Sequence, residues 1–117
     1  MSELIADLGQ LAKRLDAAWS IETSSLWSID NPARGQCGVT SLVVQDLFGG
    51  HILKTSLPEG PHFYNFIAGH RFDLTAGQFN HVLDYQDTPS SREEAMSDTS
   101  PAQYCALRRS LGLPVKD

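Results

Sequence analysis

The sequence has 117 residues, enough for one compact domain and too few for two of ordinary size, so we treat residues 1–117 as a single domain. Hydrophobic residues make up 41% and charged residues 20%, which is typical of a globular chain and argues against disorder, collagen-like repeats or a disulfide scaffold. Nine basic and 14 acidic residues give a formal charge of −5, and because no basic run is present, we expect no nucleic acid as a partner.

The chain opens with apolar residues at helical spacing, which predict an amphipathic helix from near the start to about Trp19. They are Leu4, Ile5, Leu8, Leu11 and Leu15. The first residues are acidic rather than basic, and no apolar stretch approaches membrane-spanning length. We therefore expect a soluble, cytoplasmic protein without a membrane partner.

A Ser-, Asn-, Pro- and Gly-bearing stretch, SIETSSLWSIDNPARGQ, then breaks the periodicity and predicts an ordered loop. From Cys37 to Phe48, the apolar positions Val39, Leu42, Val43 and Leu47 fit a helical stripe, and two glycines at 49 and 50 supply a stop signal. The β-branched residues in this run are also compatible with a buried strand, but its length and the glycine pair favour a helix.

Three short segments rich in aromatic and β-branched residues, HILKTS, HFYNFIA and RFDLT, predict an antiparallel sheet with a turn near residues 68–70. Residues 86–100 are polar and acidic and predict an exposed connection or lid, to which we assign no chemistry. Ser100 and Pro101 are suited to start a last helix, which should end near Leu111. The expected fold class is α+β, with N-terminal helices packed on a small antiparallel sheet.

The sequence has two cysteines in different contexts, so we expect reduced thiols. Cys37 falls at the predicted start of a helix, where unpaired N–H groups and the helix dipole favour a thiolate, the reactive form of cysteine. The alternative is that Cys37 is a small buried hydrophobe, which is what most free cysteines are. Cys105, inside the last predicted helix, is expected in the core.

The predicted hairpin carries His62 on one strand and Asp73 on the next. If Ala68 and Gly69 form a two-residue turn, residue 64 pairs with Asp73, and His62 lies on the same face as its diagonal neighbour. A longer turn or a bulge would send Asp73 to the opposite face, and Asn65 is the weaker candidate for a third member. Taken singly, a hairpin histidine or a strand-end aspartate is more often structural.

Two stretches, NPARGQCGVTSLVVQDLFGG and HFYNFIAGHRFDLTAGQF, resemble the YunG-like family of small bacterial proteins over about half of the chain. The order of cysteine on a helix, histidine on a strand and aspartate on the next strand also resembles the core of papain-like and transglutaminase-like enzymes. That resemblance implies Cys37 as nucleophile, His62 as general base and Asp73 as the orienting group. It also implies Gln36 or backbone N–H groups at Cys37 as oxyanion donors.

The leading hypothesis is thus a cysteine hydrolase or acyl transferase with a Cys37, His62 and Asp73 triad, acting without a cofactor on a small molecule or peptide. Tyr64 and Trp27 are candidates to line the substrate pocket, although core packing is the usual role of such aromatic residues. A non-enzymatic module that binds a peptide or small ligand is the alternative. A third reading is a metal site on the same three side chains, but no CxxC pair or HExxH run supports it.

Overall fold

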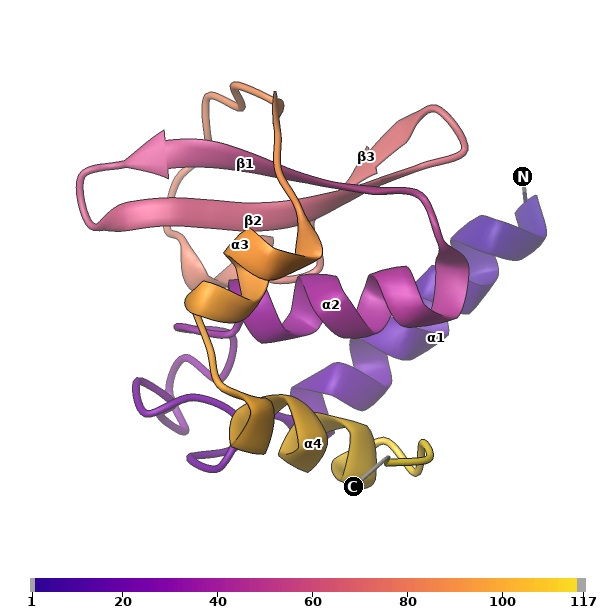
Figure 1. The fold of residues 1–117 in the computed structure, drawn as a ribbon, viewed down its shortest axis with the longest axis vertical. Helices are drawn as coiled ribbons and strands as arrows, with labels where there is room; N and C mark the ends of the chain where they lie inside the picture. Colours follow the sequence, from indigo (N-terminus) through magenta and orange to yellow (C-terminus); the bar gives the residue numbers. More distant parts are fainter. Residues whose placement is uncertain (1, 116–117) are drawn as a thin grey trace.

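The computed structural model describes residues 2–115 as an α+β fold. The four helices are α1 (Ser2–Ala18), α2 (Cys37–Phe48), α3 (Arg92–Ser97) and α4 (Pro101–Ser110). The four strands are β1 (His51–Leu57), β2 (Gly60–Ile67), β3 (His70–Phe72) and β4 (Thr88–Pro89), in the sheet order β3-β2-β1-β4. All three strand pairs are antiparallel, and the sheet lies above the helices in Figure 1.

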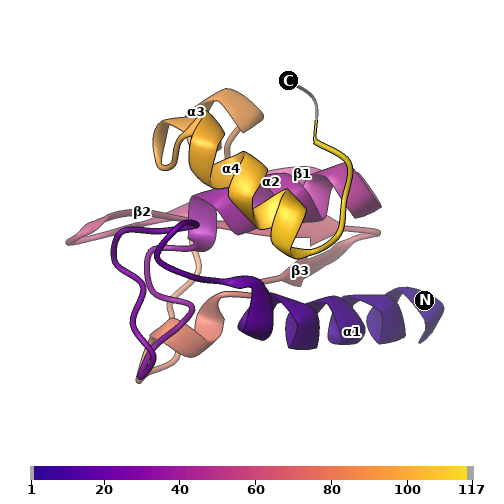
Figure 2. The same ribbon diagram turned by 90° about the horizontal axis from the view of Figure 1, so that it is seen from below.

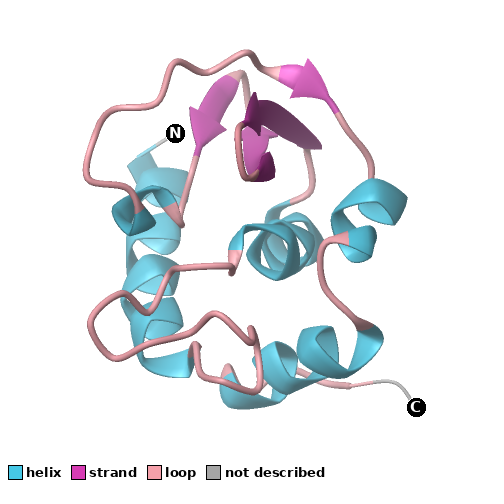
Figure 3. Cartoon of the chain, turned by 90° about the vertical axis from the view of Figure 1, so that its left-hand side faces the viewer, coloured by secondary structure: helices cyan, strands magenta, loops and turns pink. Residues whose placement is uncertain are grey.

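Helix α2 lies in the centre of the fold, as Figure 3 shows in a view along its axis. The sheet covers one side of α2, and α1 and α4 cover other sides (Figure 2). Every residue of α2 from Cys37 to Val44 is buried, so its first two turns have no solvent face. Burial on all sides explains the β-branched residues in this helix, because packing overrides their weak helix propensity. The predicted helix from Cys37 to Phe48 is confirmed.

The β2–β3 hairpin has the register expected from a two-residue turn. Ala68 and Gly69 both have positive φ, at 52° and 81°, as such turns require. Asn65 pairs with Phe72, so the next position along the same register sets residue 64 opposite Asp73. The predicted strand over residues 71–75 is nevertheless too long, because β3 ends at Phe72 and the chain turns away from the sheet at Asp73.

Residues 86–100 form more structure than the exposed connection expected from their polarity. Thr88 and Pro89 add β4 to the edge of β1, and α3 follows directly. The Ser91 hydroxyl accepts the Glu94 N–H at the start of α3, as a capping serine does. Ser100 caps α4 in the same way, which confirms the predicted last helix. Serine caps thus begin two helices at residues 91 and 100, in and next to a segment expected only as an exposed connection or lid.

The long loop between α1 and α2 consists of successive turns. Of its large apolar side chains, Trp27 is half-buried against the core, whereas Leu26 and Ile29 are 54% and 81% exposed. Within residues 2–115, the structure has no helix that is both long enough and apolar enough to cross a membrane.

Candidate active site

A buried acid–base pair lies where the β2–β3 hairpin ends. His62 Nε2 is 2.7 Å from Asp73 Oδ2, and the two side chains are only 3% and 5% exposed. The other carboxylate oxygen, Oδ1, accepts the backbone N–H and the hydroxyl of Thr75, and the Tyr85 hydroxyl donates to Oδ2 at 2.7 Å. Because Phe79 also contacts the His62 ring edge-on, the imidazole is held in one orientation.

The second nitrogen of the imidazole, Nδ1, has no hydrogen-bond partner among residues 2–115. A neutral His62 that donates its Nε2–H to Asp73 leaves Nδ1 as a proton acceptor. This is the arrangement that a general base needs, since the carboxylate fixes the tautomer and stabilises the imidazolium that forms after proton transfer.

Cys37 is the first residue of α2. It lies beside the part of β2 that comes before residues 65–67, with which β3 pairs. There the backbone N–H of Phe63, the residue after His62, donates to the Cys37 sulfur. Cys37 as a whole is 8% exposed. The thiol in turn donates to the Asp98 carboxylate, with 3.5 Å between Sγ and Oδ2. Cys37 also packs in a buried apolar cluster with Leu42, Ile52, Phe63 and Ala95, so the sulfur combines apolar packing with one polar contact to Asp98.

Asp98 reaches this place from the C-terminal end of α3. Its carboxylate also accepts the backbone N–H of Gly38 in the first turn of α2. A Cβ atom at Gly38 would stand 2.6 Å from Asp98 Oδ2 and 2.9 Å from the Ala95 carbonyl oxygen, closer than real contacts allow. The absence of a side chain at position 38 therefore permits α3 and Asp98 to approach Cys37.

The electrostatics of the thiol differ from the expectation of a stabilised thiolate. Burial, followed by the charge of Asp98, raises the pKa of the Cys37 thiol from 9.0 to about 12, although the Phe63 N–H acts in the opposite direction. Burial also raises the pKa of the Asp98 carboxyl, against the hydrogen bonds from Cys37 and Gly38. The thiolate prediction was wrong first because the thiol is buried, and second because the Asp98 carboxylate already lies at the N-terminus of α2 where the negative sulfur was expected.

Cys37, His62 and Asp98 all line one pocket of about 730 Å³, a size suited to a small molecule or a short peptide segment. Its other walls come from loop residues 24–26, 31, 34 and 35, from residues 57 and 59–61 around the β1–β2 turn, from residues 78–80, and from Gln103 of α4. Serine hydroxyls and Asn and Gln amides are frequent in these walls, so the pocket is suited to polar ligands. Its lining includes the N-terminal residue of α2 and the β1–β2 turn, and Figure 1 shows the N-terminal end of α2 below that turn.

The remaining candidate residues are placed away from this pocket. Gln36 is 0% exposed, and neither polar atom of its side-chain amide has a hydrogen-bond partner in the described chain. The Tyr64 hydroxyl is bound between Thr55 and Asp87, and Trp27 contacts the core. Asn65 donates to the Ser41 carbonyl at 3.0 Å, so its amide joins β2 to α2. None of these side chains lines the pocket shared by Cys37 and His62.

Asp98 is the residue of the candidate site that sequence reasoning missed. It lies in a polar segment with several other acidic residues, and nothing in its neighbours marks it. The one usable signal was Gly38 directly after the cysteine, since a glycine in a helix often marks a close approach of another element. Both cysteines are free thiols, with Cys105 half-buried on α4, and no group of three potential metal ligands is assembled within residues 2–115.

Residues 7–114 of the chain match the family described as YunG protein. The chain is also 52% identical over 94 residues to the uncharacterised protein YunG of Bacillus subtilis (strain 168), a match that covers 80% of this chain and 82% of that protein. No solved structure matches the chain.

Proposed function

We propose that this chain, which belongs to the YunG family, is a cysteine-dependent hydrolase or acyl transferase with Cys37, His62 and Asp73 as its triad. The observation that carries the proposal is the buried His62–Asp73 pair at 2.7 Å, whose imidazole shares a pocket with the Cys37 sulfur. The order of the three residues on helix, strand and hairpin end supports a core like that of papain or transglutaminase.

In the proposed reaction, the Cys37 proton passes to Nδ1 of His62 while the electron pair of the S–H bond stays on sulfur. The sulfur attacks the carbonyl carbon of an amide or ester and forms a tetrahedral oxyanion. The Cys37 backbone N–H, in the first turn of α2, is the proposed donor to this oxyanion. His62 then gives its proton to the leaving group, and water or an amine resolves the thioester.

Because the thiol is neutral at rest, proton transfer to His62 has to accompany substrate binding rather than precede it. The resting state of the site thus resembles a serine triad more than a preformed thiolate–imidazolium pair. Asp73 orients His62 for this step, since its carboxylate accepts the Nε2–H and leaves Nδ1 as the proton acceptor.

An acyl-transfer test with p-nitrophenyl acetate needs no knowledge of the natural substrate. We expect intact-mass spectrometry to detect one acetyl group on Cys37 in the wild type and in the Cys105→Ser control. Cys37→Ala should abolish this adduct, and His62→Ala should slow its formation by about 100-fold or more. Acetylation of Cys37 at an unchanged rate in folded His62→Ala would contradict the proposed role of the imidazole.

A ligand-binding module is the second candidate, favoured by the neutral thiol and by the polar pocket walls. Under this reading, a ligand found by thermal-shift screening of peptides and polar metabolites keeps its affinity in Cys37→Ala and is released unchanged. Chemical conversion of that ligand by the wild type but not by Cys37→Ala would support the enzyme instead.

A further inference from the structure

Asp98 differs from Asp46 on α2 and Glu94 on α3 in having no basic partner within the described residues. Asp46 pairs with two arginines and Glu94 pairs with Lys54. Among residues 2–115, no lysine, arginine or histidine forms an ion pair with Asp98, whose side-chain donor is the Cys37 thiol. A thiol is a weak donor for a carboxylate, so the charge of Asp98 is poorly compensated within the chain.

The carboxylate of Asp98 is also placed where a ligand would meet it. Asp98 is exposed as a residue, although its carboxyl group is partly buried against Cys37 and Gly38, and it lines the pocket that Cys37 and His62 share. Arg34 lines the same pocket, but it pairs with no acidic side chain in the described part of the chain. Glu59, on the β1–β2 turn, adds a second negative charge to the walls.

We propose that Asp98 selects substrates that carry an ammonium or guanidinium group, and that binding of this cation to the Asp98 carboxylate releases the Cys37 thiol for proton transfer to His62. The inference rests on the proposed function for the identity of the nucleophile.

In the resting site, the Cys37 S–H donates to Asp98 Oδ2, and ionisation of the sulfur would place two negative charges in contact. A cation on the carboxylate removes this repulsion and takes the place of the thiol as its hydrogen-bond donor. The thiol proton then moves to Nδ1 of His62, the electron pair remains on sulfur, and Asp98 stays a carboxylate paired with the substrate cation. Cysteine chemistry is thereby coupled to recognition of a positive charge.

Thiol reagents of opposite charge test the inference directly. In a Cys105→Ser background, we compare the rates at which Cys37 reacts with 2-aminoethyl methanethiosulfonate, a cation, and 2-sulfonatoethyl methanethiosulfonate, an anion of similar size. The reference is the cation-to-anion rate ratio at Cys105, measured in Cys37→Ser. We expect the cation-to-anion rate ratio at Cys37 to exceed this reference by about tenfold or more. Asp98→Asn should reduce this preference by about tenfold.

With the neutral reagent iodoacetamide, Asp98→Asn should raise the reaction rate of Cys37, whereas it should lower the preference for the cationic reagent. Asp98→Asn removes a negative charge beside the sulfur, so Cys37 should react faster, by about tenfold for each unit by which its pKa falls. A variant that merely loosened the fold would speed all three reagents together. Asp98→Ser, which also lacks the charge, should reproduce both changes and guards against an effect peculiar to the asparagine.

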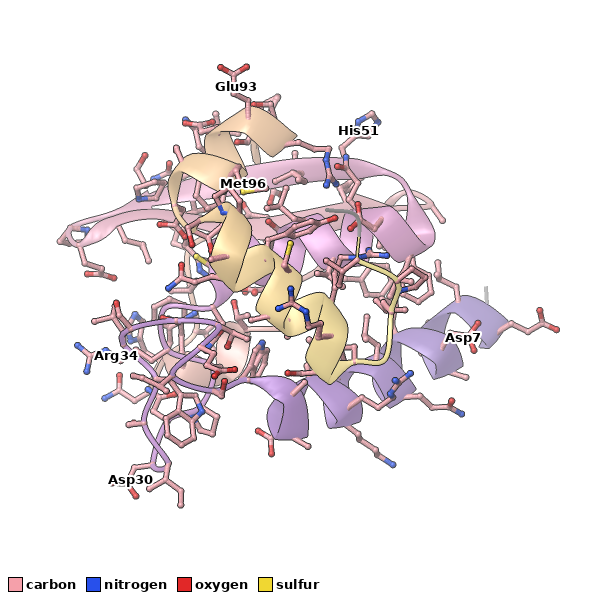
Figure 4. All side chains as sticks on the ribbon, turned by 60° about the horizontal axis from the view of Figure 1, so that its bottom comes forward. Asp7, Asp30, Arg34, His51, Glu93 and Met96 are labelled. Carbon is pink, nitrogen blue, oxygen red and sulfur yellow. The ribbon has the colours of Figure 1, made fainter. Side chains whose placement is uncertain are left out.

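Glu93→Gln is the matched control, because Glu93 is on the same helix, is exposed and points away from the molecule (Figure 4). It removes the same charge and should alter the cation preference by less than about twofold, since solvent screens a charge there. A cation preference unchanged in Asp98→Asn, or changed equally in Glu93→Gln, would overturn the inference. The modification rates do not depend on catalytic turnover. If the acetyl-transfer test fails while the cation preference of Cys37 still depends on Asp98, the proposed enzyme activity is refuted but the role of Asp98 in cation recognition is not.

Discussion

At the scale of single residues, the site depends on which negative group occupies the first turn of α2. Helix N-termini favour an anion, and the first residue of α2 is a cysteine, so the local sequence favours a thiolate. The Asp98 carboxylate instead accepts the Gly38 N–H and the Cys37 S–H. Burial of the thiol, and then the charge of that carboxylate, make a negative sulfur unfavourable, so the thiol stays protonated.

The protonated thiol leads to a prediction about stability at alkaline pH. The pKa of Cys37 is raised to about 12 in the folded protein, from 9.0 as the ordinary value. Between these values the unfolded thiol has lost its proton and the folded thiol has kept it, so the free energy of unfolding falls as pH rises. The fall should approach about 1.4 kcal/mol for each pH unit in that window.

Urea denaturation of the wild type and of Cys37→Ser at pH 8 and pH 10, with a reducing agent present, measures this loss. The wild type should lose about 1 kcal/mol more than the serine variant between the two pH values. The comparison cancels the titration of tyrosines and lysines, which both proteins share. Equal losses in the two proteins would show that burial and Asp98 do not hold the proton on the sulfur.

At the scale of secondary-structure elements, two helical glycines have opposite roles. Gly9, on α1, has no atom within 4 Å of the position a Cβ would take, so its glycine only weakens the helix. Gly38, on α2, faces Asp98 and the Ala95 carbonyl at distances too short for a Cβ. One glycine lowers stability without a packing reason, and the other allows α3 to pack against α2.

The same substitution at both positions should therefore have opposite effects. We expect Gly9→Ala to raise the free energy of unfolding by up to about 1 kcal/mol and Gly38→Ala to lower it by about 1–3 kcal/mol. Gly38→Ala should also speed iodoacetamide labelling of Cys37, because the new methyl group pushes Asp98 away from the sulfur. Urea denaturation and the labelling rate measure the two effects. A stabilised Gly38→Ala protein would mean that α3 does not pack as closely as described.

At the scale of the whole molecule, three helices meet at Asp46 on α2. Its carboxylate pairs with Arg92 of α3 at 2.9 Å and with Arg108 of α4 at 2.8 Å, and it accepts the hydroxyl of Tyr104. The Asp46 side chain is 20% exposed, so solvent screens this network only in part. Since Asp98 directly follows α3, the Asp46 network also helps to hold the Asp98 carboxylate in place.

Asp46→Asn should lower the free energy of unfolding by about 1–2 kcal/mol, because two arginines lose a charged partner at once. Amide hydrogen exchange should quicken in α3 and α4 before it quickens in α1. Asp84→Asn is the control, since Asp84 is exposed and forms no ion pair within residues 2–115. If both variants unfold at the same urea concentration, the Asp46 network contributes nothing measurable to the assembly of the helices.

Local sequence determined most of the elements of this protein, but not β4 and α3, and it determined half of the candidate site. Helical spacing and glycine or serine signals at the ends located α1, α2 and α4, because such preferences act within a few residues. The register of the hairpin predicted that His62 and Asp73 lie on the same face, since a two-residue turn fixes which side chains share a face. The end of β3 at Phe72 was not visible, because the Asp73–Thr75 hydrogen bonds compete there with the strand.

Only the tertiary structure decided the protonation of the sulfur and the content of the pocket. Asp98 is 61 residues from Cys37 along the chain, and its approach depends on the packing of α3 against a glycine of α2. A pKa is set by burial and by charges in space, which no spacing along a sequence encodes. The same is true of Gln36 and Tyr64, whose side chains the fold places in its interior rather than in the pocket.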